Sequence, residues 1–132
     1  MSLTAAIATK HGGCPGDELT TAANILEKWG TSKEQAAIIL RIPKSSFYKY
    51  LKHPETTRLD DDQLRRISYI LNIHASLRTI FENPENIYGF MTKPNHNAYF
   101  NGQTPLSLIG KGDFGALYEV QKRLDSLRGH EW

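Results

Sequence analysis

Cationic and hydroxyl side chains crowd a short stretch near the middle of the chain. Lys44, Ser45, Ser46, Tyr48 and Lys49 fall on the outward positions of a predicted helix. A lysine can donate hydrogen bonds to guanine O6 or N7, and serine and tyrosine hydroxyls suit base edges and phosphates equally well. These residue types on one helical face predict a helix that lies in the major groove of double-stranded DNA.

Positive charge is concentrated around this helix. The chain has a formal net charge of only +2, but residues 28–53 hold six cations and one anion, which gives a local net charge of +5. A focused positive patch attracts phosphates even when the whole chain is nearly neutral. Lys33 and the backbone amides at the start of the preceding helix are therefore candidate phosphate contacts. The alternative is that these charges form an ordinary solvated helical face.

Ser32–Leu51 has the pattern of two short helices joined by a tight turn. Ser32 and Gln35 predict a capping box, and the small Ala37 lets two helices cross closely. Arg41 stands at a turn position that often needs φ > 0 and is usually glycine. This pattern is typical of a helix-turn-helix. Because one such module binds DNA weakly, we expect a homodimer on a two-fold DNA site.

Helical spacing of apolar residues continues through the rest of the chain, and no stretch has the alternation of a strand. We expect an all-α fold of about eight helices after a flexible leader at residues 1–18. Apart from the helix-turn-helix, the predicted helices are Thr21–Trp29, one opened by Asp60–Asp62, a separate one after Asn72, one after Asn83-Pro84, a short one after Thr104-Pro105 and a last one capped by Asp113.

The sequence offers few residues for metal binding or covalent chemistry. The five histidines are scattered without ligand spacing, and the one cysteine, Cys14, cannot form an internal disulfide. Asp60–Asp62 is interpreted as a set of acids that complement a helix dipole rather than as metal ligands. We therefore expect no metal, no cofactor and no enzymatic activity. The absence of a signal-peptide core and of a long apolar run predicts a cytoplasmic location without membrane contact.

The last third of the chain carries an ordered set of motifs. The set begins with the apolar pair Phe90-Met91, then the Pro-Asn step Pro94-Asn95, then an aromatic-x-Gly step made by Phe100 and Gly102. It continues with a Pro-Leu helix start at Pro105-Leu106 and ends with the apolar face of a final helix, Leu117/Val120/Leu124. This order resembles the toxin-binding domain of Xre/MbcA/ParS-type antitoxins, with phenylalanine at position 90 where tryptophan is expected. These antitoxins also carry an Xre-like helix-turn-helix upstream, so the resemblance covers residues of about 21–132.

The resemblance implies a cytoplasmic bacterial antitoxin with a helix-turn-helix domain at residues 19–82 and a small helical toxin-binding domain at residues 83–132. The implied partners are a cognate toxin, typically a RES-domain protein that consumes NAD⁺, and the promoter DNA of its own operon. Residues expected to bind the toxin are Pro94, Asn95, Tyr99, Phe100, Gly102, Leu127 and Trp132. Large apolar groups on a loop or tail often anchor interfaces, although Tyr99 and Phe100 could instead cover the core.

A second hypothesis is a stand-alone helix-turn-helix transcriptional regulator. In that case the C-terminal half would only dimerise or sense a small ligand. The two hypotheses differ in their expected partner, because an antitoxin should be encoded beside a small toxin gene and should co-purify with the toxin.

Overall fold

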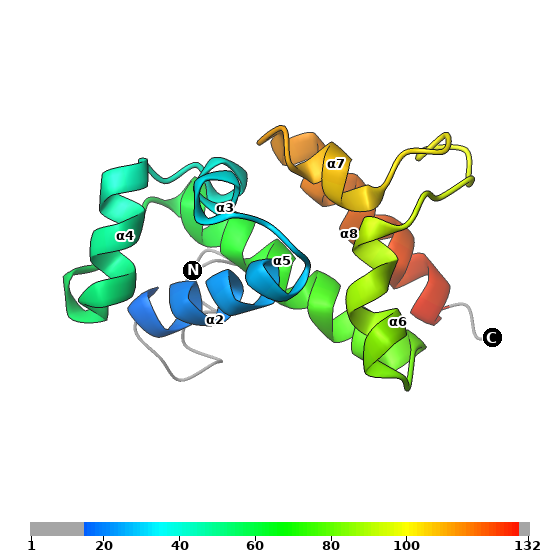
Figure 1. Cartoon of the computed structure of the whole chain (residues 1–132), viewed down its shortest axis with the longest axis horizontal. Helices are drawn as coiled ribbons and strands as arrows, with labels where there is room; N and C mark the ends of the chain where they lie inside the picture. The colour runs from blue at the N-terminus through cyan, green and yellow to red at the C-terminus, as the bar shows by residue number, and fades with distance from the viewer. Residues whose placement is uncertain (1–14, 130–132) are drawn as a thin grey trace.

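The computed structural model describes residues 15–129, and every regular element in that range is helical (Figure 1). The elements are α2 (Pro15–Lys28), α3 (Lys33–Leu40), α4 (Lys44–Lys52), α5 (Asp61–Ile80), α6 (Pro84–Gly89), α7 (Pro105–Ile109) and α8 (Phe114–Gly129), with 3₁₀ turns at Pro54–Thr56 and Phe90–Thr92. The predicted all-α fold is therefore confirmed. Within these residues no helix is long and apolar enough to cross a membrane.

Local capping chemistry determines where several helices begin. At the start of α3, α5, α6 and α7, one side chain accepts a hydrogen bond from a backbone amide of the first turn. These side chains are Ser32, Asp60, Asn83 and Thr104, in that order. Such bonds satisfy amides that have no partner inside the helix. At α3 the Gln35 side chain lies against Gly110, where an added Cβ would come within 2.6 Å of its Nε2 atom. Of the predicted capping box, the bond from the Gln35 amide to the Ser32 hydroxyl is present, while the Gln35 side chain lies against the residue that follows α7.

Helix α2 begins earlier than predicted. Its first residue is Pro15, so residues 15–18, which we expected in the leader, form a helical turn before the predicted start at Thr21. Tertiary contact explains the extension. A Cβ added to Gly16 would lie 2.3 Å from the Pro54 carbonyl oxygen, so the glycine lets this turn pack directly on the Pro54–Thr56 turn. Cys14 lies outside the described residues.

Helix α5 is one continuous helix of 20 residues, and the predicted break at Asn72 is wrong. Asn72 is exposed on the outer face and leaves the buried stripe uninterrupted. That stripe consists of Ile67, Ile70, Ile73 and Leu77, which are at most 2% exposed. Their spacing keeps one face of the helix on the core across the predicted break, so packing outweighs the weak helix propensity of asparagine.

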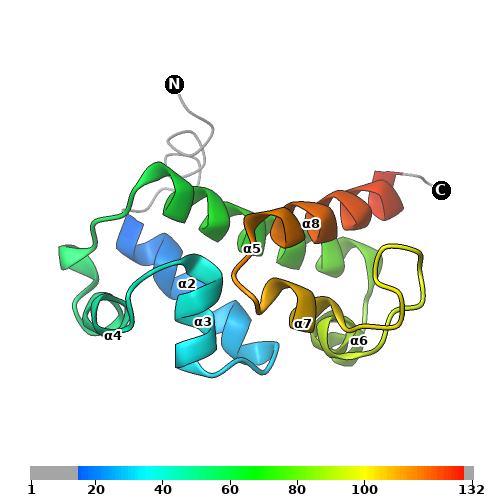
Figure 2. The same ribbon diagram turned by 90° about the horizontal axis from the view of Figure 1, so that it is seen from above.

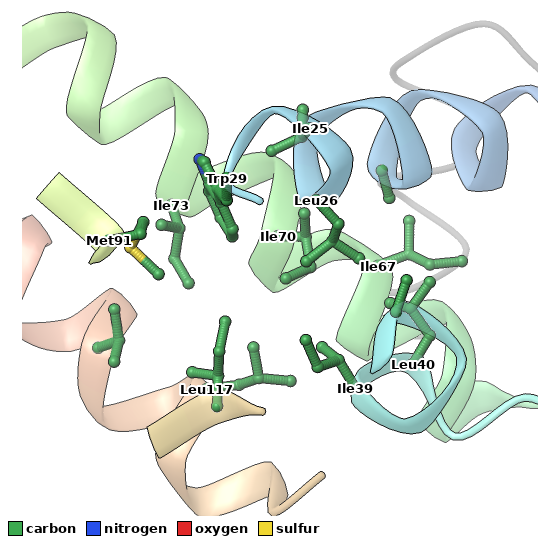
Figure 3. Close-up of a cluster of buried hydrophobic side chains, with 14 of the residues drawn as sticks. Ile25, Leu26, Trp29, Ile39, Leu40, Ile67, Ile70, Ile73, Met91 and Leu117 are labelled. Atoms are coloured by element: carbon green, nitrogen blue, oxygen red, sulfur yellow. The ribbon is translucent and has the colours of Figure 1, made fainter. Parts of the chain in front are cut away.

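One cluster of buried side chains joins the N-terminal and C-terminal helices around α5 (Figure 3). Trp29, Ile73 and Met91 gather on one side of the close-up, and Ile39 and Leu117 lie farther along the same core. Burial of this apolar surface is the main source of stability. The described residues therefore share one core rather than two separate ones.

Helices α5 and α8 lie side by side and run in the same direction (Figure 2). Near their first turns, the Arg66 guanidinium lies over the Phe114 ring at 5.7 Å. Toward their last turns, the Ser76 hydroxyl donates to Asp125 at 3.3 Å. The parallel pair places the C-terminal half of α8 at the end of the molecule opposite α4.

The turn between α3 and α4 has the conformation expected of a helix-turn-helix. Arg41 adopts φ 58° and ψ 40°, which is the left-handed region that glycine usually occupies. Its amide donates to the Ile38 carbonyl, and the Ile42 amide donates to the Ala37 carbonyl. These two bonds end α3 and direct the chain into α4. A non-glycine residue in this conformation costs about 1 kcal/mol, so other contacts of Arg41 must offset it.

Candidate DNA-binding and partner-binding surfaces

Helix α4 presents the predicted DNA-contacting side chains to solvent. The exposed ones are Lys44, Ser45, Tyr48 and Lys49, and Ser46 is half-buried. Phe47, which is 1% exposed, anchors the opposite face of α4 in the core. A short helix held by one aromatic anchor, with cations and hydroxyls outward, has the geometry of a recognition helix.

Glu34 on α3 holds two of these side chains. Its carboxylate lies 3.2 Å from the Lys44 ammonium nitrogen and accepts a hydrogen bond from the Tyr48 hydroxyl at 3.4 Å. The pKa of Glu34 is lowered by a hydrogen bond from its own backbone amide and then by Lys44. Glu34 is the one anion among residues 28–53, and its role could not be predicted, because a contact between two helices leaves no local signal in the sequence.

Lys33 borders a hollow between three helices. It is exposed at the first position of α3 and lines a cavity of about 360 Å³ whose other walls come from α2 and α4. Phe47 and Leu51 form the α4 side of this cavity. The cavity therefore brings a lysine at a helix N-terminus close to α4, which is the arrangement a phosphate contact needs.

An ion-pair cluster fixes the turn of the helix-turn-helix to α5. The Arg41 guanidinium pairs with Asp60 and, through Nε, with Asp62 at 2.6 Å. The Gln63 side-chain amide donates to the Arg41 carbonyl at 2.9 Å. Hydrogen bonds from the Gln63 amide and then from Arg41 hold the pKa of Asp60 below its ordinary value. These contacts stabilise the left-handed conformation of Arg41.

Arg66 extends this cluster into the core and across to α8. Its Nε donates to Asp62 at 3.0 Å, and its Nη1 donates to the carbonyls of Ile39 at 3.1 Å and Gly112 at 2.8 Å. Although Arg66 is charged, it is only 6% exposed. Ile39 belongs to the last turn of α3, and Gly112 belongs to the loop before α8. One buried guanidinium therefore ties the helix-turn-helix to the C-terminal helices.

A groove lies between the loop after Lys93 and the C-terminal half of α8. Three of the residues predicted to bind a toxin line it, namely Asn95, Phe100 and Leu127. Phe100 is 2% exposed and forms part of the core as well as the groove, whereas Leu127 is 42% exposed. The cavity volume is about 420 Å³. This is enough space to receive one or two large side chains from a partner.

The other predicted toxin-binding residues lie around this groove or outside the described range. Pro94 is exposed and, with Asn95, lines a smaller adjacent cavity of about 280 Å³. Tyr99 is half-buried beneath the Arg123 guanidinium at 4.6 Å. Gly102 adopts φ 85°, a left-handed conformation that closes the loop. Trp132 lies outside the described residues.

Two family matches divide the described chain between them. Residues 18–72 match the antitoxin Xre-like helix-turn-helix domain, and residues 76–129 match the antitoxin Xre/MbcA/ParS C-terminal toxin-binding domain. The chain belongs to the Xre/MbcA/ParS antitoxins. It is also similar to protein y4oB of Sinorhizobium fredii (strain NBRC 101917 / NGR234), an uncharacterized protein, with 31% identity over 113 residues that cover 85% of this chain and 84% of the relative.

The family matches assign a kind of partner to each end of this antitoxin. The matched helix-turn-helix stretch contains α3 and α4, which carry the residues expected to contact DNA. The matched toxin-binding stretch contains the groove and α8, which are the elements expected to contact a toxin. The two stretches meet inside the unbroken helix α5, whereas the boundary that we predicted at residues 82 and 83 stays a prediction.

Proposed function

We propose that this antitoxin binds and neutralises a cognate toxin through its C-terminal part and represses its own operon through α4. The proposed toxin is a RES-domain protein that consumes NAD⁺, and the proposed DNA is the promoter of the shared operon, bound by a homodimer. The observation that carries the proposal is that a single chain matches both an antitoxin helix-turn-helix domain and a toxin-binding domain.

The charge and shape of α4 support the DNA-binding half of this proposal. Lys44 and Lys49 are exposed on the same helix, and Lys33 lies on the neighbouring one. Cations placed in this way release counterions when they meet phosphates, which supplies sequence-independent affinity. Hydroxyls such as that of Tyr48 can then distinguish base edges.

The groove beside α8 supports the toxin-binding half. Five apolar and five polar or charged side chains line it, and the α8 residues among them lie at the end of the molecule away from α4. Interface energy concentrates where large apolar side chains enter such hollows. The antitoxin could therefore hold its toxin while α4 remains accessible to DNA.

Co-expression with the neighbouring gene product tests the proposal. The antitoxin should relieve the growth arrest caused by that protein and should co-purify with it as a stable complex. A double variant, Lys44→Ala with Lys49→Ala, should still neutralise the toxin but should no longer shift promoter DNA in a gel. If the wild-type antitoxin neither rescues growth nor co-purifies with the neighbouring gene product, the toxin-binding proposal is wrong.

A further inference from the structure

The groove beside α8 has a preformed apolar floor. Phe90, Phe100 and Leu124 line it from three different segments of the chain, and Leu127 stands exposed at its edge. A single exposed leucine is ordinary on a protein surface, but this one stands beside the aromatic floor, so one large apolar side chain of a partner would contact both. The groove thus has the form of a socket for one apolar anchor.

The loop that forms the opposite wall of the groove is held in shape by its own backbone. The Asn95 amide donates to the Gln103 carbonyl at 3.1 Å, and the Gly102 amide donates back to the Asn95 carbonyl at 2.8 Å. The Asn95 side chain also accepts a hydrogen bond from the Asn97 amide at 3.0 Å. Because these bonds order the loop before any partner arrives, binding has little loop entropy to overcome.

The rim of the groove is positively charged. Lys122 and Arg123 line it, and Lys93 is exposed at the adjacent smaller cavity. Within residues 15–129 neither lysine forms an ion pair, and Arg123 pairs with Glu119 at 3.3 Å. Asp125, on the same helix, accepts hydrogen bonds from the neutral side chains of Ser76 and Gln121 and keeps its negative charge. The three cations Lys93, Lys122 and Arg123 thus outnumber the two carboxylates of Glu119 and Asp125 on α8.

We propose that the groove binds a toxin segment in which one large apolar side chain is flanked by carboxylates. The apolar side chain packs between Phe90, Phe100 and Leu127, and the carboxylates face Lys122 and Arg123. This inference rests on the proposed function and specifies the chemistry of the toxin surface. Complementary charge of this kind accelerates encounter and excludes partners whose segment is basic.

The test measures the affinity of the full-length antitoxin for the purified toxin encoded beside it, at several NaCl concentrations. Lys122→Glu should weaken binding about tenfold at low salt and should flatten the salt dependence. Leu127→Asp should weaken binding at every salt concentration, because it places a charge in the apolar socket. Lys111→Glu is the matched control, since Lys111 is also an exposed lysine but lies on the loop before α8 and does not line the groove. Thermal unfolding of each variant verifies that it is folded.

Photo-crosslinking identifies the bound segment directly. With p-benzoylphenylalanine in place of Leu127, the crosslinked toxin peptide should contain Asp or Glu within a few residues of an aromatic or aliphatic anchor. A crosslinked peptide without acids, or a crosslink to a second antitoxin copy, would overturn the inference. Unchanged affinity in both Lys122→Glu and Leu127→Asp would do the same, whereas no binding by the wild-type chain would overturn the proposed function itself.

Discussion

Replacing Arg66 with methionine should destabilise the whole antitoxin, because this buried guanidinium joins three parts of the fold. The change removes hydrogen bonds to the Ile39 carbonyl, the Gly112 carbonyl and the Asp62 carboxylate. Methionine has a long unbranched side chain and fills much of the space of the arginine stem, while the cation–π contact of the guanidinium with Phe114 is lost together with the hydrogen bonds. The variant therefore isolates the loss of polar contacts from the loss of packing.

The expected loss follows from those three bonds. Leaving a buried carbonyl without a donor costs about 1 kcal/mol or more, and losing a bond to a charged group costs somewhat more. Asp62 is partly exposed and keeps its pairing with Arg41, so the full penalty of an unpaired buried charge does not apply. The sum is about 3 kcal/mol, which corresponds to a fall in Tm of about 10 °C for a domain of this size.

Urea and thermal unfolding monitored by circular dichroism would measure this change. Arg65→Met is the matched control, because Arg65 is an exposed arginine next to Arg66 on α5 and its loss should change the free energy of unfolding by less than about 0.5 kcal/mol. Arg66→Lys should fall between the wild type and Arg66→Met, since lysine keeps the charge but lacks the planar fork. Equal stability of Arg66→Met and Arg65→Met would refute the role assigned to Arg66.

Two further predictions concern DNA binding and pH. Lys44→Ala and Lys49→Ala should each reduce the slope of log K for DNA binding against log salt concentration by about one. Glu34→Gln should make that slope steeper, because it frees Lys44 from its carboxylate partner. Gel shifts with promoter DNA at several salt concentrations measure both effects, and equal slopes in all variants would remove α4 from the DNA interface. Burial of the His74 imidazole, and to a lesser extent the positive charge of Arg78, lowers the pKa of His74 from its ordinary value of 6.5. The unfolded chain therefore binds a proton at this residue more readily than the folded chain does. As a result, the free energy of unfolding should fall as pH drops below about 6.5. His74→Gln should lessen that fall when urea unfolding is compared between pH 7.5 and pH 5, and an identical pH dependence would contradict the assignment.

Short-range signals made the helix-turn-helix predictable. Ser32 and Asp60 are caps whose partners lie three residues away, and the turn at Arg41 follows from local steric rules. Arg41 adopts the left-handed conformation that its turn position often needs, and the structure adds the reason why arginine is tolerated there. Its guanidinium binds Asp60 and Asp62, two acids for which the local pattern indicates only an interaction with the helix dipole.

Contacts between distant segments could not be predicted from the sequence. Arg66 and Gly112 are far apart in the chain, and nothing in the local pattern of either residue indicates that one donates to the other. The continuity of α5 was missed for a related reason, since the helix persists through Asn72 because both halves pack on a shared core. The groove also depends on the loop and α8 lying side by side, so Lys122 and Arg123 were not among the predicted binding residues.

The close seating of Gly112 on α3 restricts how such antitoxins can acquire new partners. With φ 83° and an added Cβ only 3.0 Å from Ile38 Cγ2, this position accepts little but glycine. If recombination replaced all residues after α5, the new segment would have to keep this glycine and the bond that its carbonyl accepts from Arg66. Otherwise the new segment could not pack on α3 and α5. Substitutions near Lys122 and Leu127 carry no such requirement. Under the toxin-binding role proposed for the groove, toxin specificity would change by point mutation at the far end of α8, while the DNA-binding half is inherited unchanged.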